Sequence, residues 1–170
     1  MIYSNIEHVI PELFEHGKTP FFIILDQVTD VRNVGSIARS AECAGVDAMI
    51  IPDKGNAMLN ADAVKTSAGA LTRIKVCRVS SLKNSLKFIK DSGIKIIGAS
   101  EGSDKLYYQT EYKSPIALLM GSEEKGIGPE LIPLCDDLVK IPMQGEINSL
   151  NVSVATGILL FEALKQRMEQ

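Results

Sequence analysis

The sequence predicts an α/β fold in which a mostly parallel sheet is flanked by helices. Short apolar bursts alternate with longer amphipathic stretches along the chain, as expected when each strand is followed by a helix. Most of the bursts are continuous rather than alternating, which is typical of parallel strands buried on both faces. A length of 170 residues, with 45% hydrophobic and 23% charged residues, fits one globular domain.

Six strands are expected from the apolar bursts, at residues 21–25, 48–51, 75–79, 94–98, 116–120 and 138–141. Six helices are expected between and around them, at residues 5–15, 34–44, 61–68, 82–91, 129–134 and 152–167. Gly17, Gly45 and Gly93 directly follow three of these helices, where a residue with positive φ ends a helix. Pro129 suits the first position of the fifth helix. This order predicts right-handed crossovers within one sheet.

Composition excludes several classes of protein. No apolar run approaches the roughly 18 residues that span a bilayer, and the N-terminus lacks the basic and apolar regions of a secretory signal. We therefore expect a cytoplasmic protein with no membrane partner. Cys43, Cys77 and Cys135 are odd in number and lack CxxC spacing, so neither a disulfide framework nor a zinc site is expected. The two histidines, His8 and His16, lie far from any glycine-rich stretch, so any catalysis must proceed without histidine or cysteine.

Charge is unevenly distributed, although the net charge is only −3. Residues 51–95 hold 9 basic and 3 acidic side chains, a local charge of +6. The basic face expected there consists of Lys54, Lys65, Arg73, Lys75, Arg78, Lys83, Lys87 and Lys90. Such a face is compatible with nucleic-acid binding, and equally with a solvated helix surface, because its last three lysines follow helical spacing.

Three polar stretches follow expected strands or open expected helices, where open α/β sheets bind ligands. In the first, Arg39 lies within a helix of small apolar residues and requires an anionic partner, either a ligand phosphate or an internal carboxylate such as Glu42 or Glu123. Asn33 or Asp30 could cap this helix. Both possibilities for Arg39 remain open from the sequence.

The second stretch, residues 121–129, is glycine-rich and presents Glu123 at the mouth of the sheet. It matches neither a Walker A loop nor GxGxxG, and a plain turn is the alternative. The third stretch opens the last helix with Ser149, Asn151 and Ser153, of which only one is needed as a cap. The remaining polar side chains indicate a lined pocket near a helix end that attracts anions.

Together these stretches resemble the SpoU (TrmH-like) family of RNA ribose 2′-O-methyltransferases, within the SPOUT superfamily. Residues 26–41 are similar to the family motif DxxxDPxNxGxxxRxA, residues 121–126 to GSEGxG, and residues 141–155 to IPMxGxxxSLNVSxA. Val31 replaces the usual proline and Glu124 a common glycine. The resemblance extends over nearly the whole chain, and its third motif is highly specific.

The resemblance implies a SPOUT-type fold with a C-terminal trefoil knot, a homodimer, S-adenosyl-L-methionine as methyl donor, RNA as substrate and no metal. The implied catalytic residues are Asn33, Arg39, Glu123, Ser149 and Asn151. The implied cofactor contacts are Ala99, Ser100, Gly121, Ile141, Met143 and Leu150.

Overall similarity is greatest to the branch that modifies guanosine in 23S rRNA, with tRNA as the alternative substrate. A catalytically silent RNA-binding module and a nucleotide-binding protein of another class are the competing functions. Residues 1–20 are expected to be an N-terminal helix and linker remnant, and residues 21–170 the catalytic domain. Arg39 is either a general base or, because a guanidinium resists deprotonation, an electrostatic stabiliser.

Overall fold

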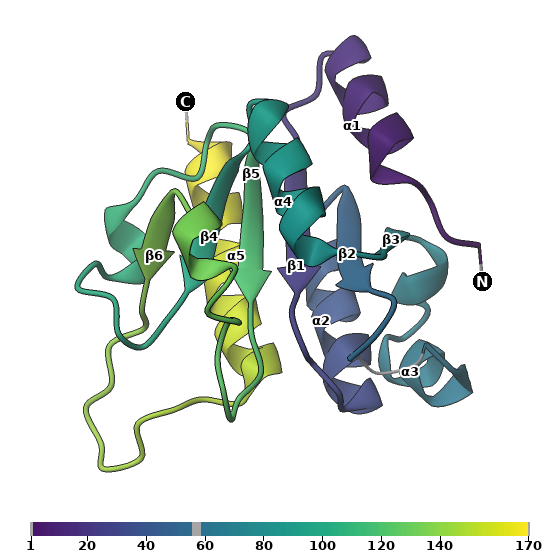
Figure 1. Cartoon of the computed structure of the whole chain (residues 1–170). Helices are drawn as coiled ribbons and strands as arrows, with labels where there is room; N and C mark the ends of the chain where they lie inside the picture. The colour runs from purple at the N-terminus through teal and green to yellow at the C-terminus, as the bar shows by residue number, and fades with distance from the viewer. Residues whose placement is uncertain (1, 56–58, 170) are drawn as a thin grey trace.

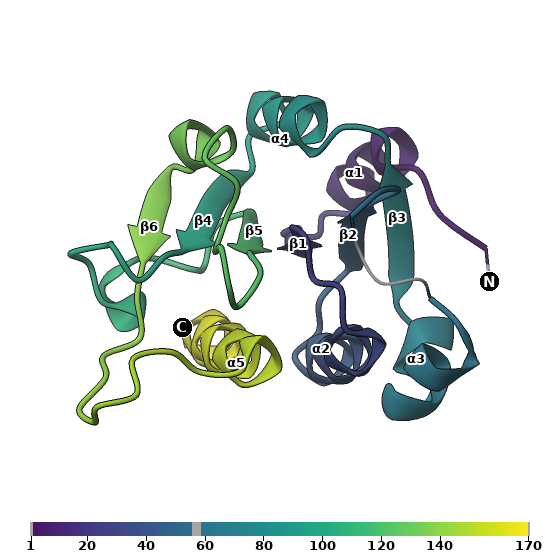
Figure 2. The same ribbon diagram turned by 60° about the horizontal axis from the view of Figure 1, so that its bottom comes forward.

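The computed structural model describes residues 2–55 and 59–169, which form a single six-stranded sheet with helices on both faces (Figures 1 and 2). Every neighbouring pair of strands is parallel, and the strand order is β3-β2-β1-β5-β4-β6. The strands are β1 (Phe21–Leu25), β2 (Ala48–Pro52), β3 (Lys75–Val79), β4 (Lys95–Ala99), β5 (Ile116–Met120) and β6 (Asp137–Val139). The predicted α/β class is confirmed.

Two helices cover one face of the sheet and three cover the other (Figure 2). The first face carries α1 (Ile6–Glu15) and α4 (Leu82–Asp91). The second carries α2 (Val31–Cys43), α3 (Ala61–Thr66) and α5 (Val152–Met168). No helix of the described residues is both long and apolar enough to cross a membrane.

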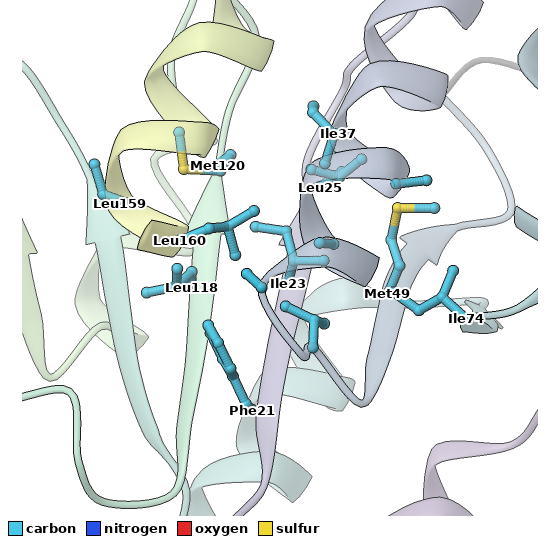
Figure 3. Packing of buried hydrophobic residues seen from close by; sticks show 14 of the residues in the cluster. Phe21, Ile23, Leu25, Ile37, Met49, Ile74, Leu118, Met120, Leu159 and Leu160 are labelled. Carbon is cyan, nitrogen blue, oxygen red and sulfur yellow. The ribbon is translucent and has the colours of Figure 1, made fainter. Parts of the chain in front are cut away.

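The central strand β1 is buried along its whole length, which explains its unbroken apolar sequence. Phe21 and Ile23 point towards the face that α2 and α5 cover, where Leu160 packs beside them (Figure 3). Phe22 and Ile24 belong to the separate cluster beneath α1 and α4. One strand therefore contributes to both halves of the core.

Two expected helices differ from the structure. Residues 129–134 form only a 3-10 turn, Ile132–Leu134, because Pro133 has no amide hydrogen to donate and its ring opposes a continuing helix. Helix α2 begins three residues earlier than expected, and Asp30 caps it by accepting a hydrogen bond from the amide of Arg32 at 2.8 Å. Asn33 therefore lies inside the helix and is not its cap.

The last turn of α5 is fixed to the amino ends of the two central strands. Arg167 lies over the ring of Phe21, with 4.6 Å between the guanidinium carbon and the ring centroid. It also donates hydrogen bonds of 2.7–3.1 Å to the backbone carbonyls of Thr19, Pro20, Tyr112 and Ser114. This contact sets the position of α5 along the sheet.

Candidate active site

A cavity of about 750 Å³ lies at the carboxyl ends of β4, β5 and β6, the ends that point downwards in Figure 1. The residues that follow these strands form its walls, and the long segment that leads into α5 closes one side. Its volume is within the range of small-molecule sites, and the carboxyl edge is where open α/β sheets bind ligands. The cavity is therefore the candidate active site.

A tightly folded loop, residues 121–128, forms the wall that follows β5. A Cβ atom on Gly121 would lie 2.1 Å from the backbone carbon of Gly126, so only glycine fits at residue 121. Gly126 has a φ of +69°, which glycine adopts without strain. Glu124, which replaces the common glycine of the family motif, is exposed and has no positive φ, so this loop does not require glycine there.

Asp26 supports this loop from beneath. Its side chain is buried, with the residue only 5% exposed, and its Oδ2 accepts a hydrogen bond from the amide of Gly128 at 2.8 Å. Burial raises the pKa of the Asp26 carboxyl, and the bond from Gly128 partly offsets this rise. Asp26 is not among the expected site residues, although it is the first residue of the stretch 26–41 that resembles the family motif and directly follows five apolar residues.

Glu123 connects the loop to the beginning of α5. Its Oε1 accepts hydrogen bonds of 2.9 Å from the amide of Val152 and from Nδ2 of Asn151. The same Nδ2 donates to Oδ1 of Asn33 on α2 at 3.1 Å. The side-chain amide of Asn151 therefore connects Asn33 and Glu123, two other expected catalytic residues that are distant in the sequence.

Asn151 is also the N-cap of α5. Its Oδ1 accepts hydrogen bonds from the amides of Ser153 and Val154, at 2.9 and 3.3 Å, and from the hydroxyl of Ser153. The side chain thus uses its oxygen to begin the helix and its nitrogen to bind Glu123 and Asn33. Asn suits both functions because its amide has two N–H donors as well as an oxygen, whereas Ser has a single O–H and an ionised Asp has no donor.

The expected site residues fall into three groups in the structure, of which the third is Arg39 alone. The first group lines the cavity and consists of Ala99, Ser100, Gly121, Glu123, Ile141, Met143, Ser149 and Leu150. This group includes every residue expected to contact the cofactor. The second group, Asn33 and Asn151, is not part of the lining: Asn151 donates a hydrogen bond to Glu123, and Asn33 accepts one from Asn151.

Arg39 lies apart from the cavity. It is exposed on α2, and within residues 2–55 and 59–169 it forms neither an ion pair nor a side-chain hydrogen bond. The internal salt bridge to Glu42 or Glu123 is not formed, and Glu123 instead binds the start of α5. Arg39 and Ser149 therefore share no cavity within one chain, and the guanidinium is available for an external anion.

The cavity combines apolar and polar walls. Met120, Val139 and Leu159 provide buried apolar surface, while Ser100, Glu123 and Ser149 bring polar side chains. Such a surface suits a ligand with both an apolar and a polar part. Across the described part of the chain, no group of three or more His, Cys, Asp or Glu side chains is arranged to hold a metal ion.

Known proteins are similar to this chain in both sequence and architecture. The profile of the SpoU rRNA Methylase family matches residues 20–161. The chain is 43% identical to the 23S rRNA (guanosine-2′-O-)-methyltransferase RlmB of Photorhabdus laumondii and 42% identical to that of Escherichia coli K12, in each case over 95% of this chain and 66% of the relative. The AdoMet-bound rRNA methyltransferase from Sinorhizobium meliloti superposes with a TM-score of 0.89 at 28% identity, over 99% of this chain and 63% of that chain.

The fold and the cavity define an α/β protein with a candidate small-molecule site at the carboxyl edge of a parallel sheet. The match over most of its length shows that the chain belongs to the SpoU rRNA Methylase family. The chain spans just under two thirds of the length of the curated relatives it matches.

Proposed function

We propose that the protein is an S-adenosylmethionine-dependent methyltransferase that modifies the ribose 2′-hydroxyl of a guanosine in 23S rRNA. The observation that carries this proposal is the cavity at the strand ends, with Glu123 at its wall bonded to Asn151. The names of the relatives, which are 42–43% identical to this chain over the 161 residues that match, support the reaction and the substrate. Such a substrate places the protein in the cytoplasm.

The cavity fits the proposed cofactor in size and in chemistry. Ile141 and Leu150 offer apolar surface, and the tight turn at Gly121 brings backbone groups to the wall. Ala99, Ser100 and Met143 line the remaining side. When bound there, S-adenosylmethionine supplies an electrophilic methyl group.

Positioning and electrostatics are the contributions of the protein itself. A ribose hydroxyl is a poor nucleophile until its proton leaves or its alkoxide is stabilised. Because a guanidinium resists deprotonation, we assign to Arg39 the binding of the RNA phosphate and the stabilisation of the developing alkoxide. Glu123, Asn151 and Asn33 hold the start of α5, and with it the position of Ser149 at the cavity.

A second copy of the chain would bring Arg39 to the cavity. Helices α2 and α5 lie side by side, and α5 exposes Val154 and Phe161 at 51% and 46% (Figure 2). An apolar face of this kind is suited to pairing between subunits. The proposed enzyme is therefore a homodimer in which Arg39 of one subunit acts at the site of the other, around the C-terminal trefoil knot implied by the family.

The proposed division of the chain follows from the same family. Residues 21–170 would form the catalytic domain, and residues 1–20 an N-terminal helix and linker remnant. In the structure, α1 packs against the sheet through Val9 and Ile10, so this helix contributes to the same core.

The test is transfer of a tritiated methyl group to unmodified 23S rRNA and tRNA, with mapping of the modified ribose. We expect transfer to rRNA, and a loss of about 100-fold or more in Arg39→Ala at unchanged melting temperature, because Arg39 is exposed and stabilises charge only in the reaction. Arg73→Ala, another exposed arginine, is the matched control and should retain activity.

Three results would contradict parts of the proposal. Transfer only to tRNA would correct the substrate, and RNA binding without any transfer would identify a silent binding module. Full activity in Arg39→Ala would remove this residue from the mechanism. Mixing inactive Arg39→Ala and Ser149→Ala chains should restore activity in mixed dimers if Arg39 acts across subunits, and no recovery would place both residues in one chain's site.

A further inference from the structure

A second cavity, of about 430 Å³, lies beside β3, the edge strand at the end of the sheet opposite β6. The N-terminal segment, the end of β3 and the first turns of α4 enclose it. We call it the β3 groove, and the residues that matter here are Tyr3, Glu7, Arg78, Ser81, Asn84 and Ser85. The candidate active site lies at the carboxyl ends of β5, β4 and β6, which form the opposite half of the sheet, so the two cavities occupy different parts of the sheet.

The groove lies where two helices begin. Helices α1 and α4 each have ten residues, and their N-caps, Asn5 and Ser81, both line the groove. The Oγ of Ser81 accepts a hydrogen bond from the amide of Asn84 at 3.1 Å, which uses only one of the free amides of the first turn. The positive ends of these helices favour an anion.

Arg78 supplies a full positive charge at the same place. Its guanidinium carbon lies 4.8 Å from the centroid of the Tyr3 ring, which orients the planar group. Among the described residues, no carboxylate forms an ion pair with Arg78. An oriented guanidinium without an acidic partner is suited to binding a phosphate.

Ser85 gives an independent indication of a ligand. The residue is 8% exposed and lines the groove, and its hydroxyl has no hydrogen-bond partner in the parts of the chain that the structure describes. A buried hydroxyl left unbonded costs about 1–3 kcal/mol, so buried polar groups normally have partners. A phosphate oxygen in the groove would accept a hydrogen bond from this hydroxyl.

The charges around the groove indicate where an anion would lie. Lys83 and Lys87 are exposed on α4 and form no ion pair with a described residue, whereas Lys90 pairs with Asp136 at 3.4 Å. Glu7 lines the groove on the α1 side and repels an anion there. The favourable position is therefore between Arg78 and the beginning of α4.

We propose that the β3 groove binds one backbone phosphate of the RNA substrate, at a distance from the site of methyl transfer. The choice of RNA rests on the proposed function, whereas the phosphate chemistry rests on Arg78, Ser85 and α4. The groove would position the RNA and would leave the methyl-transfer step itself unaffected, since it lies away from the candidate active site and phosphate contacts there fix only the register and orientation of the RNA.

The experiment measures binding of a fluorescent single-stranded RNA of about 20 nucleotides to the full chain at several salt concentrations. One phosphate contact to single-stranded RNA contributes about 0.7 to the slope of log K against log salt, so its loss costs about fivefold at about 0.1 M salt. We expect Arg78→Gln to show this loss and the shallower slope, and we expect Arg73→Gln, outside the groove, to show a smaller loss.

Ser85→Ala separates ligand binding from a structural role. We expect it to weaken RNA binding about twofold while its melting temperature stays equal or rises, because it removes a buried hydroxyl without a partner. In methyl transfer, Arg78→Gln should raise the KM for RNA about fivefold and leave kcat unchanged.

The outcomes distinguish this proposal from the proposed function. An unchanged salt slope in Arg78→Gln, or an equal loss in Arg73→Gln, would overturn the groove as a site. A fall in kcat at saturating RNA would also overturn it, because the groove would then act in the chemistry. If the wild-type chain transferred no methyl group and its RNA binding still depended on Arg78, the groove would stand and the enzyme would not.

Discussion

The two ends of α5 differ in how their polar groups are used. At its C-terminal end, Arg167 is satisfied by four backbone carbonyls and the ring of Phe21, all within the fold. At its N-terminal end, Asn151 is exposed and forms hydrogen bonds with Asn33 and with Glu123, which lines the cavity. One end holds the helix on the sheet, and the other shapes a surface that a ligand can reach.

This contrast teaches that one helix can separate stability from function along its length. Substitutions at the anchored end should change mainly the free energy of unfolding. Substitutions at the open end should change mainly methyl transfer. The free energy of unfolding and the rate of methyl transfer can both be measured on the same variants.

The largest effect on stability is expected at Arg167. Arg167→Ala removes hydrogen bonds to four carbonyls and the contact over Phe21, so the free energy of unfolding should fall by about 3 kcal/mol. Urea denaturation followed by circular dichroism measures this. Arg167→Lys should recover only part of the loss, because an ammonium cannot reproduce the planar fork. A loss below 0.5 kcal/mol for the alanine variant would contradict the anchoring role.

A smaller effect on stability, with a clear effect on activity, is expected at Asn151. Asn151→Ala removes the cap and should cost about 1 kcal/mol of unfolding free energy. Asn151→Ser keeps a capping oxygen, so it should be nearly as stable as the wild type, but its single O–H on a shorter side chain cannot donate to both Glu123 and Asn33. Methyl transfer should fall about tenfold in both variants. If Asn151→Ser kept full activity, the hydrogen bonds to Glu123 and Asn33 would have no functional role.

The smallest effect is a pH dependence at Asp26, beneath the loop that carries Glu123. Burial raises the pKa of this carboxyl above its ordinary value of 3.8, so the folded state holds the proton more tightly than the unfolded state. Its stabilising contribution is therefore present below pH 3.8 and is lost as the pH rises through the folded pKa.

Asp26→Asn removes this titration while keeping an oxygen for the amide of Gly128. The stability of the variant minus that of the wild type should increase as the pH rises through this window and then stay constant. Chemical denaturation of both proteins at a series of pH values checks the prediction. A difference that falls with rising pH would show that the folded state lowers this pKa instead.

Local patterns predicted most of the elements but not their arrangement. The expected bounds of the strands at residues 21–25, 75–79 and 116–120 match β1, β3 and β5. In β1 and β5 a continuous apolar run identified a strand buried on both faces, whereas the edge strand β3 also carries Lys75 and Arg78. The order β3-β2-β1-β5-β4-β6 depends on which strands pair, and pairing between distant segments leaves no local signal.

The candidate site was predictable as a set of residues and not as a geometry. The motif resemblance identified Glu123 and Asn151 as site residues. It did not predict that the amide of Asn151 joins Glu123 to Asn33. Asn33 and Asp30 were equal candidates for the cap of α2, since both residue types favour that position. The choice of Asp30 follows from where the helix begins, which local propensity defines only to within a few residues.

The bond between Arg167 and the carbonyl of Pro20 joins residues 147 positions apart. A ribosome that adds about 5–20 residues per second needs roughly 7–30 s to make the chain between them. During that interval the amino end of β1 is complete but lacks its covering guanidinium. The amino end of β1 is thus among the first parts of the sheet to be synthesised and among the last to gain all of its native contacts.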